Sequence, residues 1–330
     1  MRMPQHFLLS SAARTLSLAS VVRMSDEEVE RVFIRLRWQS NNGDAYCPHC
    51  GCTTVYMARR PNGAPRWRCK ACRKDFSVTS GTLFAFHKMP LRSYLMAIAI
   101  FANEVKGKSM LALSRDLGTQ YKTAFVLAHK MREAMSHEVR AHEELGKDGK
   151  SAAVDGGYFG GYVKPANLKE NRVDRRKRRN QSGKRQVVVV IRERDGVTLP
   201  GVFKSEAEAL SFIRRKVVPG AELHADESGA WNPLHGRFVM HRINHQEAYS
   251  LDGACTNDAE SFFSRMRRAE IGHHHHIAGP YLTRFAQEMA WREDHRRDPN
   301  GSQVDRIVAL AMGNKPSVDF CGYWQRSRAA

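Results

Sequence analysis

Four cysteines occur in two Cys-x-x-Cys pairs, Cys47 with Cys50 and Cys69 with Cys72, and 18 residues separate the pairs. Two thiolate pairs on tight turns are a common ligand set for tetrahedral Zn²⁺. Between the pairs lie strand-like runs joined by a turn that contains Pro, Asn and Gly. The spacing therefore predicts a structural zinc ribbon, in which the metal folds the module and performs no chemistry.

Two aspartates follow predicted strands in the second half of the chain. Asp155 ends the apolar run 152–154, and Asp226 ends the run 221–225. A hairpin and an amphipathic helix separate the two strands, and in a mixed sheet such an order can bring both carboxylates to one edge. Two carboxylates there can hold Mg²⁺ or Mn²⁺, which prefer oxygen ligands. The alternative, for either aspartate alone, is an ordinary turn residue.

A third polar group comes from the predicted helix 256–272. Asn257 and Glu260 lie three residues apart at its start, and Arg267 lies two turns beyond Glu260 on the same face. An acid on a helix that faces the two strand-end aspartates would complete a two-metal site, and the arginine would reach a nucleic-acid backbone. The alternative is structural, because Asn257 can cap the helix and Glu260 can close a capping box.

The charge of the chain favours a polyanionic partner. Its 330 residues include 53 Lys and Arg against 34 Asp and Glu, a formal net charge of +19. Nucleic acid is the first partner that this balance suggests, and an anionic membrane is the second. The positive charge is concentrated in the run 164–185 and in the predicted ribbon. The ribbon contributes Arg59, Arg60, Arg66, Arg68, Lys70, Arg73 and Lys74.

The same composition excludes several classes of protein. No stretch of about 18 uncharged apolar residues occurs, so we expect no membrane span. Without a secretory signal the expected compartment is the cytoplasm, where cysteines stay reduced and bind metal rather than form disulfides.

The region between the ribbon and the first aspartate is predicted to be helical. Ser109 can cap a helix that ends at Gly118, and a second helix follows after a short turn. The second helix carries Tyr121, Lys122, His129, Lys130 and Arg132. This pattern fits a DNA-binding helix-turn-helix, and the alternative is an ordinary antiparallel helical hairpin.

These elements predict a multidomain chain with a zinc ribbon and a helical region first, and an α/β domain with a mixed sheet second. The expected domains are a helical lead-in (1–40), a zinc ribbon (41–80), a helix-turn-helix-like region (81–140), an α/β catalytic domain (150–297) and a C-terminal tail (298–330).

Taken in order, the motifs resemble those of the zinc-ribbon insertion-sequence transposases of the ISXO-like group. The similarity runs from about residue 15 to about residue 297. It is carried by RW…YCPHCG, RCKACRKDFSVTSGTLF, SRDLGTQYKTAFVLAHKMREAM, VDGGYFGG, HADESGAW, TNDAESFFSRMRRAEIGHHHHI and YLTRFAQEMAWREDHRR.

The resemblance implies that residues 150–297 form a DDE-type, RNase H-like catalytic domain of a bacterial enzyme. Asp155 and Asp226 would be its first two catalytic acids. The third position in this group is Asn or Glu, so both Asn257 and Glu260 match it. We favour Glu260 for its carboxylate. Arg267 stands where the group commonly has a lysine.

The implied activity is metal-dependent cleavage and strand transfer at the ends of an insertion sequence. Zn²⁺ would be structural and Mg²⁺ or Mn²⁺ catalytic. The implied partners are the DNA of the transposon ends and of the target, bound by a homo-oligomer associated with the nucleoid.

Two positions depart from the pattern of the group. Gly156 stands where an acidic residue usually follows the first aspartate. The block His273–His276 resembles a shorter Tyr-His-His, and either contact with DNA or a fortuitous Ni²⁺ or Zn²⁺ site would suit it.

A function of a different class also fits most of these features. A non-catalytic DNA-binding regulator, such as an inactive or domesticated transposase, would keep the ribbon, the helices and the positive charge. The acids alone separate this alternative from the enzyme.

Overall fold

The chain divides into two compact units, each of which is described by itself. The computed structural model describes residues 6–59, 63–86, 88–142, 144–160, 165–174, 183–243, 250–251 and 254–326. One unit comprises Met1–His137 with His295–Ala330, and the other comprises Glu138–Asp294. Arg60 and part of the basic run 164–185 expected to meet phosphates (residues 164 and 175–182) lie outside the described residues. In the described part of the chain, no helix is long and apolar enough to cross a bilayer.

The first unit is mainly helical. Its helices are α1 (Leu18–Arg23), α2 (Asp26–Arg37), α3 (Leu91–Asn103), α4 (Met110–Asp116), α5 (Tyr121–Ala141, which continues into the second unit), α9 (Asn300–Gly313) and α10 (Tyr323–Arg326). Helix α2 begins with a capping box, in which the hydroxyl of Ser25 accepts from Glu28 N and the carboxylate of Glu28 accepts from Ser25 N.

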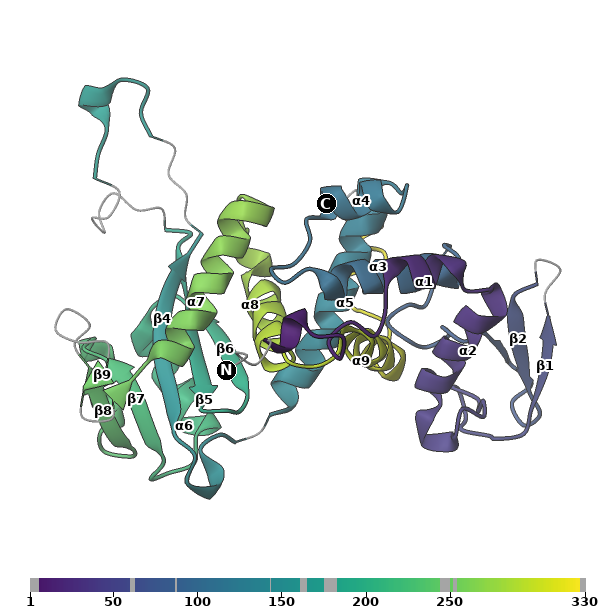
Figure 1. The fold of residues 1–330 in the computed structure, drawn as a ribbon, viewed down its shortest axis with the longest axis horizontal. Coiled ribbons are helices and arrows are strands. Elements are labelled where there is room, and N and C mark those ends of the chain that lie inside the picture. Colours follow the sequence, from purple (N-terminus) through teal and green to yellow (C-terminus); the bar gives the residue numbers. More distant parts are fainter. Residues whose placement is uncertain are drawn as a thin grey trace, which may run out of the picture. The chain divides into compact units, whose positions relative to one another are not determined.

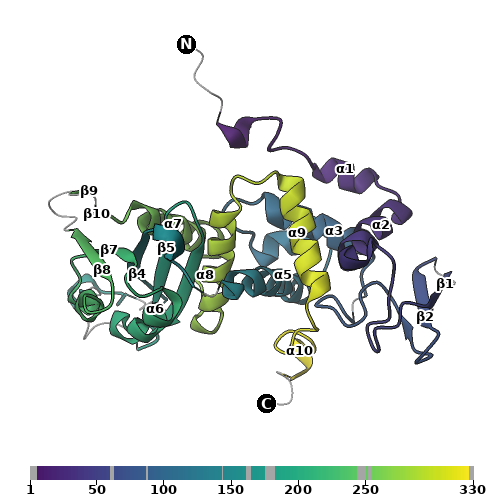
Figure 2. The same ribbon diagram turned by 90° about the horizontal axis from the view of Figure 1, so that it is seen from below.

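Residues from the end of the chain complete this unit. Helix α9 packs against α2 and α3, where it buries Val304, Ile307 and Val308 (Figure 2). The side chain of Asn300 binds the segment before α1, accepting from Thr15 N and Leu16 N at 2.9 and 3.0 Å. Residues expected as a C-terminal tail therefore contribute to the core of the first unit.

The zinc-ribbon segment forms a small antiparallel sheet. Its strands are β1 (Val55–Arg59), β2 (Pro65–Cys69) and β3 (Asp75–Phe76), in the order β1-β2-β3. Trp67 of β2 packs edge-on against Trp38 from the end of α2, with ring centroids 5.2 Å apart, and stacks on Phe76. All three rings are buried. Because this core is small, it needs the additional stabilisation that a bound metal supplies.

Helices α4 and α5 occupy the region expected to be a helix-turn-helix. Ser109 caps α4 by accepting from Ala112 N, and Gly118 ends the turn after it with a φ of 60°, as the sequence predicted.

The polar residues of α5 are not all available to DNA. His129 and Arg132 are fully buried and Lys130 is 7% exposed, so the interpretation that these three residues face DNA is wrong. The ring of Phe320 stacks on His129, with centroids 4.8 Å apart. Tyr121, at the start of the helix, remains exposed.

The second unit is built on a five-stranded mixed sheet. Its strands are β4 (Ala152–Phe159), β5 (Gln186–Glu193), β6 (Thr198–Phe203), β7 (Glu222–Asp226) and β8 (Val239–Ile243), in the order β6-β5-β4-β7-β8. Strands β4, β5 and β6 are antiparallel neighbours, whereas β7 and β8 run parallel to β4. Short strands β9 (Ser250–Leu251) and β10 (Ala254–Cys255) form a separate pair. This arrangement is the mixed sheet of an RNase H-like domain.

Helices cover both faces of this sheet. Helix α7 (Asn257–Ala269) lies across β4, and α8 (Gly279–Asp294) packs on the same face against β6 (Figure 1). Helix α6 (Leu210–Lys216) and the 3-10 turn before it, Glu206–Ala209, lie on the opposite face. Strand β5 is covered on both sides, so its consecutive residues 187–191 are fully buried.

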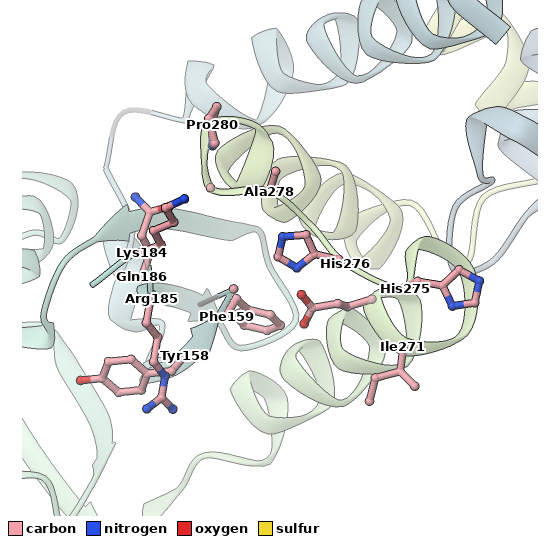
Figure 3. A pocket seen from close by; sticks show the side chains of 13 residues that line it. Tyr158, Phe159, Lys184, Arg185, Gln186, Ile271, His275, His276, Ala278 and Pro280 are labelled. Carbon is pink, nitrogen blue, oxygen red and sulfur yellow. The ribbon is translucent and has the colours of Figure 1, made fainter. Parts of the chain in front are cut away.

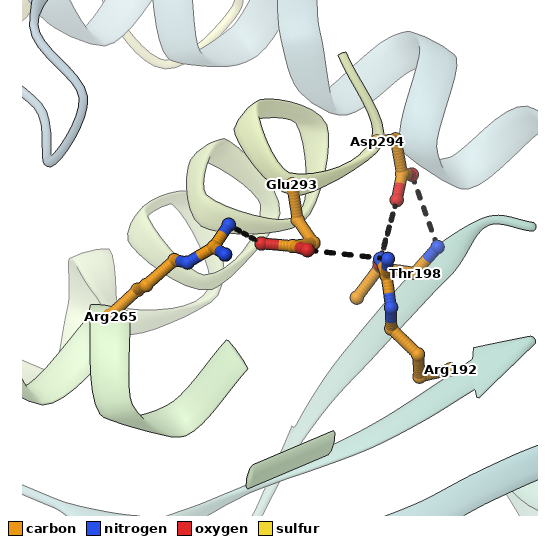
Figure 4. A network of polar contacts seen from close by, with 5 residues as sticks. All are labelled: Arg192, Thr198, Arg265, Glu293 and Asp294. Atoms are coloured by element: carbon orange, nitrogen blue, oxygen red, sulfur yellow. Dashed lines mark hydrogen bonds and ion pairs between the residues drawn. The ribbon is translucent and has the colours of Figure 1, made fainter. Parts of the chain in front are cut away.

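A buried ionic network holds α8 to the sheet (Figure 4). Arg192 of β5 pairs with Glu293 at 3.3 Å and with Asp294 at 3.0 Å. Asp294 also accepts from Thr198 N and Thr198 Oγ1, at 3.1 and 2.6 Å. Arg265 of α7 pairs with Glu293, so one network joins two strands and two helices.

Replacing Arg192 by Ala should lower the free energy of unfolding by about 3–5 kcal/mol, because it leaves two buried carboxylates without a main partner. Urea denaturation of the purified protein measures this change. Arg194→Ala, which removes an exposed arginine in the turn directly after the strand, is the matched control and should have little effect. Equal losses from the two substitutions would contradict the role given to the network.

Candidate metal-binding and active sites

The four cysteines of the ribbon converge on one point. The Sγ atoms of Cys47 and Cys72 are 3.6 Å apart, as are those of Cys50 and Cys69, and all four lie within 4.8 Å of one another. This is the arrangement that a tetrahedral Zn²⁺ with four sulfur ligands requires. The donor set and its geometry therefore fit a structural zinc ion, as predicted.

The backbone of each turn supports the sulfurs. Cys72 N donates to the Sγ of Cys69 at 3.5 Å, and this amide is the main cause of the lowering of the Cys69 pKa to about 6. His49 N donates to the Sγ of Cys47 at 3.4 Å in the same way. Such hydrogen bonds from backbone amides to sulfur favour the thiolate, which is the form that binds metal.

Pairing of β4 with β7 brings the two predicted aspartates together. The register pairs Ala153 with His224 and Val154 with Ala225, and Asp155 and Asp226 each follow by one residue. Neighbouring strands lie about 4.8 Å apart. Val154 and Ala225 are paired and point to one face of the sheet. Because side chains alternate along a strand, the next residues, Asp155 and Asp226, both point to the opposite face. The parallel register therefore sets the two carboxylates side by side on one face of the sheet. Asp226 ends β7 as expected, whereas Asp155 lies within the central strand β4, which continues to Phe159, so the expectation that Asp155 ends its strand is wrong.

Helix α7 lays Glu260 over the same face. Its Phe263 packs on Gly157 so closely that a Cβ atom on this glycine would lie 2.6 Å from the ring. Phe263 also stacks on Phe159, with centroids 6.2 Å apart. Because the helix runs alongside β4 in this way, Glu260 lies beside Asp155, one turn before Phe263. Its carboxylate is near enough to raise the pKa of Asp155.

The two other predicted site residues of α7 lie at either side of Glu260. Asn257 is exposed at the first position of the helix, and Thr256 rather than Asn257 is the N-cap residue. The capping box considered from the sequence does not form; instead Thr256 Oγ1 donates to Glu260 Oε1 at 3.2 Å. Arg267 lies over the ring of Phe159, 5.9 Å from its centroid, and is exposed. The charge of Glu260 acts on Asp155, and the choice between Glu260 and Asn257 as the third site residue stays a prediction.

Hydrogen bonds hold the aspartates in place. The indole of Trp231, a fully buried residue, donates to Asp226 Oδ1 at 2.7 Å, and Ser228 N donates to the same oxygen at 3.3 Å. Gly156 N donates to Asp155 Oδ1 at 2.6 Å. These bonds leave the second oxygen of each aspartate available to another group.

A fourth carboxylate, Glu206, was missed from the sequence. Its Oε1 lies 2.7 Å from where a Cβ atom of Gly156 would be, so only glycine at 156 leaves room for it. Ser228 Oγ donates to its other oxygen at 2.9 Å. Glu206 follows Ser205 at the start of a predicted helix. An acid in the first turn of a helix is common, so the sequence offered no reason to assign it to a site. The glycine that departs from the pattern of the family was the one available signal.

The acids form an electrostatically coupled cluster. Burial, together with the charges of Asp226, Glu260 and Glu206, raises the pKa of Asp155 to about 7. Burial also raises the pKa of Glu206. Such a cluster is stable when a cation offsets the repulsion, and oxygen ligands of this kind suit Mg²⁺ or Mn²⁺. Within the described residues, the cysteine sulfurs are the one group of three or more ligand atoms that all lie within 4.8 Å, so the carboxylate oxygens are spread more widely.

Comparison with known protein families identifies the chain. Residues 149–294 match the ISXO2-like transposase domain, and residues 24–75 match the transposase zinc-ribbon domain. The chain belongs to the ISXO2-like transposase family. The resemblance seen in the sequence is therefore confirmed, as are the zinc ribbon and the RNase H-like domain.

A relative with the same extent is known from an archaeon. An uncharacterised protein in transposable element ISH50 of Halobacterium salinarum is 21% identical over 295 residues, which cover 88% of this chain and 98% of the relative. No solved structure matches the chain significantly. Membership of the ISXO2-like transposase family implies an enzyme that binds DNA.

The histidine block of this ISXO2-like protein follows α7. Residues Glu270–His274 form a π-helical turn, and His275 adopts a φ of 56° where the chain turns back. Among the described residues, these histidines belong to no group of three or more metal ligands. Contact with DNA and a fortuitous Ni²⁺ or Zn²⁺ site both stay predictions for this block.

Removing zinc from the ribbon should unfold it. We expect Cys69→Ser, or a strong chelator, to expose Trp38 and Trp67, because the ribbon core is too small to persist alone. The measurement is a red shift of tryptophan emission with loss of one bound zinc per chain. Cys52→Ser is the matched control, since Cys52 lies in the same segment outside the cluster and should keep the metal.

Without added divalent ions, the protein should lose stability as the pH rises from about 4 to about 7. The raised pKa of Asp155 means that the folded protein holds a proton which the unfolded chain has released in this range. Thermal unfolding followed at several pH values measures the slope, and Asp155→Asn should reduce it. Added Mg²⁺ should restore stability at pH 8, by binding the ionised acids. An unchanged slope in the variant would contradict the assignment of this proton.

Proposed function

We propose that this protein is a DNA transposase that cleaves and joins strands at the ends of an insertion sequence, with Asp155, Asp226 and Glu260 as its catalytic acids. The observation that carries the proposal is the approach of these three residues to one another on one face of the sheet. They come from two parallel strands and a helix that are far apart in sequence. A structural role does not require three coupled acids, because their mutual repulsion opposes folding.

The donor set supports a catalytic pair of divalent ions. When bound there, Mg²⁺ or Mn²⁺ would activate the attacking hydroxyl and stabilise the oxygen that leaves. Asp226, fixed by the indole of Trp231, offers its second oxygen as a ligand. Asp155 is able to keep a proton near neutral pH until a cation displaces it. Glu260 approaches from α7 and Glu206 from the opposite face.

Exposed basic residues on α7 and in the ribbon support binding of DNA. Arg267 extends from α7 beyond Phe159 and can reach a phosphate next to the scissile one. In the ribbon, Arg59 and Arg66 are engaged with Glu30 and Asp75, which leaves other exposed basic residues for phosphate contact. These are Arg68, Lys70, Arg73 and Lys74.

We propose that the ribbon and the helices α4 and α5 bind the transposon ends. Two copies of the protein would bring paired ends together, and the target DNA would be the second substrate. Of the helical residues suggested by the sequence, the exposed Tyr121 and Lys122 at the start of α5 are the ones suited to contact DNA.

The deciding experiment measures Mg²⁺-dependent nicking of DNA that carries the ends of the element. Asp155→Asn, Asp226→Asn and Glu260→Gln should each reduce the rate on the order of 10³-fold or more, because each removes an oxygen ligand. Binding of the same DNA should change little. Asn257→Ala is the matched control on α7 and should lose far less.

The pattern of losses also tests the choice of the third acid. A larger loss in Asn257→Ala than in Glu260→Gln would transfer the third role to Asn257. If all three acid variants nicked DNA as well as the unaltered protein, the enzyme would be refuted, and a non-catalytic DNA-binding regulator would remain.

A further inference from the structure

A cavity of about 1350 Å³ opens at the far end of β4 (Figure 3). It is enclosed by the end of β4, the start of β5 and the segment 270–280 that joins α7 to α8. All of these segments belong to the second unit. The volume exceeds what one nucleotide needs, since pockets for whole small ligands measure about 300–1000 Å³.

The lining combines aromatic and basic side chains. The guanidinium of Arg185 lies 4.5 Å from the centroid of the Tyr158 ring, and the two are side by side at the mouth of the cavity. Tyr158 is 40% exposed, although most aromatic rings of this unit are buried. Lys184, next in sequence, is exposed on the same rim. Aromatic rings and arginine planes accept stacked bases, and lysines accept the phosphates between them.

The floor of the cavity combines an apolar ring with two polar side chains. Phe159 is buried there and stacks on Phe263 of α7. His276 points into the cavity above Phe159. The carboxylate of Glu270 also lines it and accepts a weak hydrogen bond from Ile277 N at 3.4 Å. A carboxylate in this position repels phosphate but accepts a hydrogen bond from the amino group of a base.

The cavity lies on the path of a strand that reaches the acids. Asp155 and Phe159 belong to the same strand, four residues apart, which corresponds to about 13 Å along β4. Arg267 lies over Phe159, between the acid cluster and the cavity. A DNA strand that ran along β4 with its scissile phosphate at Asp155 would reach the cavity a few nucleotides away. A base inside a duplex could not enter it, because its edge is paired and both of its faces are stacked.

We propose that this cavity holds an unpaired nucleotide of the cleaved DNA strand. The base stacks on the Tyr158–Arg185 pair, Lys184 binds its phosphate, and Glu270 accepts from an amino group of cytosine or adenine. This inference rests on the proposed function and names a subsite for its substrate. Its consequence is that the enzyme must open the duplex near the cleavage position.

The test measures binding rather than cleavage. The full-length protein with Asp155→Asn, which prevents cutting, is mixed with an end-containing duplex that has a short single-stranded extension. The fluorescent base 2-aminopurine is placed at each extension position in turn. We expect quenching at one or two adjacent positions, and Tyr158→Ala should abolish it while Tyr158→Phe preserves it. Tyr158→Ala should also weaken binding of the extended duplex about 5- to 100-fold, with little change for a blunt duplex.

A second variant keeps the test independent of Tyr158. Lys184→Ala should weaken binding of the extended duplex and reduce the slope of log affinity against log salt by about 0.7. Lys204→Ala, an exposed lysine of the same unit outside the cavity, is the matched control. It should lower the affinities for extended and blunt duplexes equally or not at all.

Quenching that is uniform along the extension, or unchanged by Tyr158→Ala, would overturn the subsite. The proposed catalytic acids would be unaffected by that result, because their test is the loss of nicking in variants that still bind DNA. In the reverse case, normal nicking by the acid variants would refute the enzyme, while position-specific quenching would still establish a nucleotide site.

Discussion

Mutual repulsion among carboxylates is the constraint around which the second unit is built. Burial raises the pKa of Asp155 to about 7, and the charges of Asp226, Glu260 and Glu206 add to the rise, so the fold must hold these acids together against their charge. Rigid supports do so: a parallel strand pair fixes the two aspartates, and a helix pressed on Gly157 fixes Glu260. The buried network that joins this helix and its neighbour to β5 and β6 keeps the supports from moving apart.

The two metal-binding arrangements differ in how they are assembled. In the ribbon, each pair of ligands comes from one short turn, so local geometry places the sulfurs two by two. The acids come from segments more than 100 residues apart in total, and only the sheet order brings them together. A metal can therefore fold the ribbon directly, whereas the acid site exists only after the whole second unit has folded.

This difference explains what could be predicted from the sequence. Cysteine spacing was sufficient for the ribbon, and aspartates that directly follow short apolar runs predicted the adjacency of Asp155 and Asp226, although β4 continues beyond Asp155. Glu206 was missed because its approach depends on a glycine across the sheet, a contact that no local pattern encodes. The burial of His129 was missed for a similar reason, since Phe320, which covers it, is almost 200 residues away. Helix amphipathicity does not reveal a partner that comes from the other end of the chain.

The return of the chain to its first unit has a consequence for synthesis. Helix α9, which packs on α2 and α3, is translated only after every residue of the sheet domain. While the ribosome makes the sheet domain, the apolar faces that α9 will cover stay open to water. The helical core of the first unit is therefore completed only after the sheet domain has been synthesised, although most of the sequence of this unit precedes that domain.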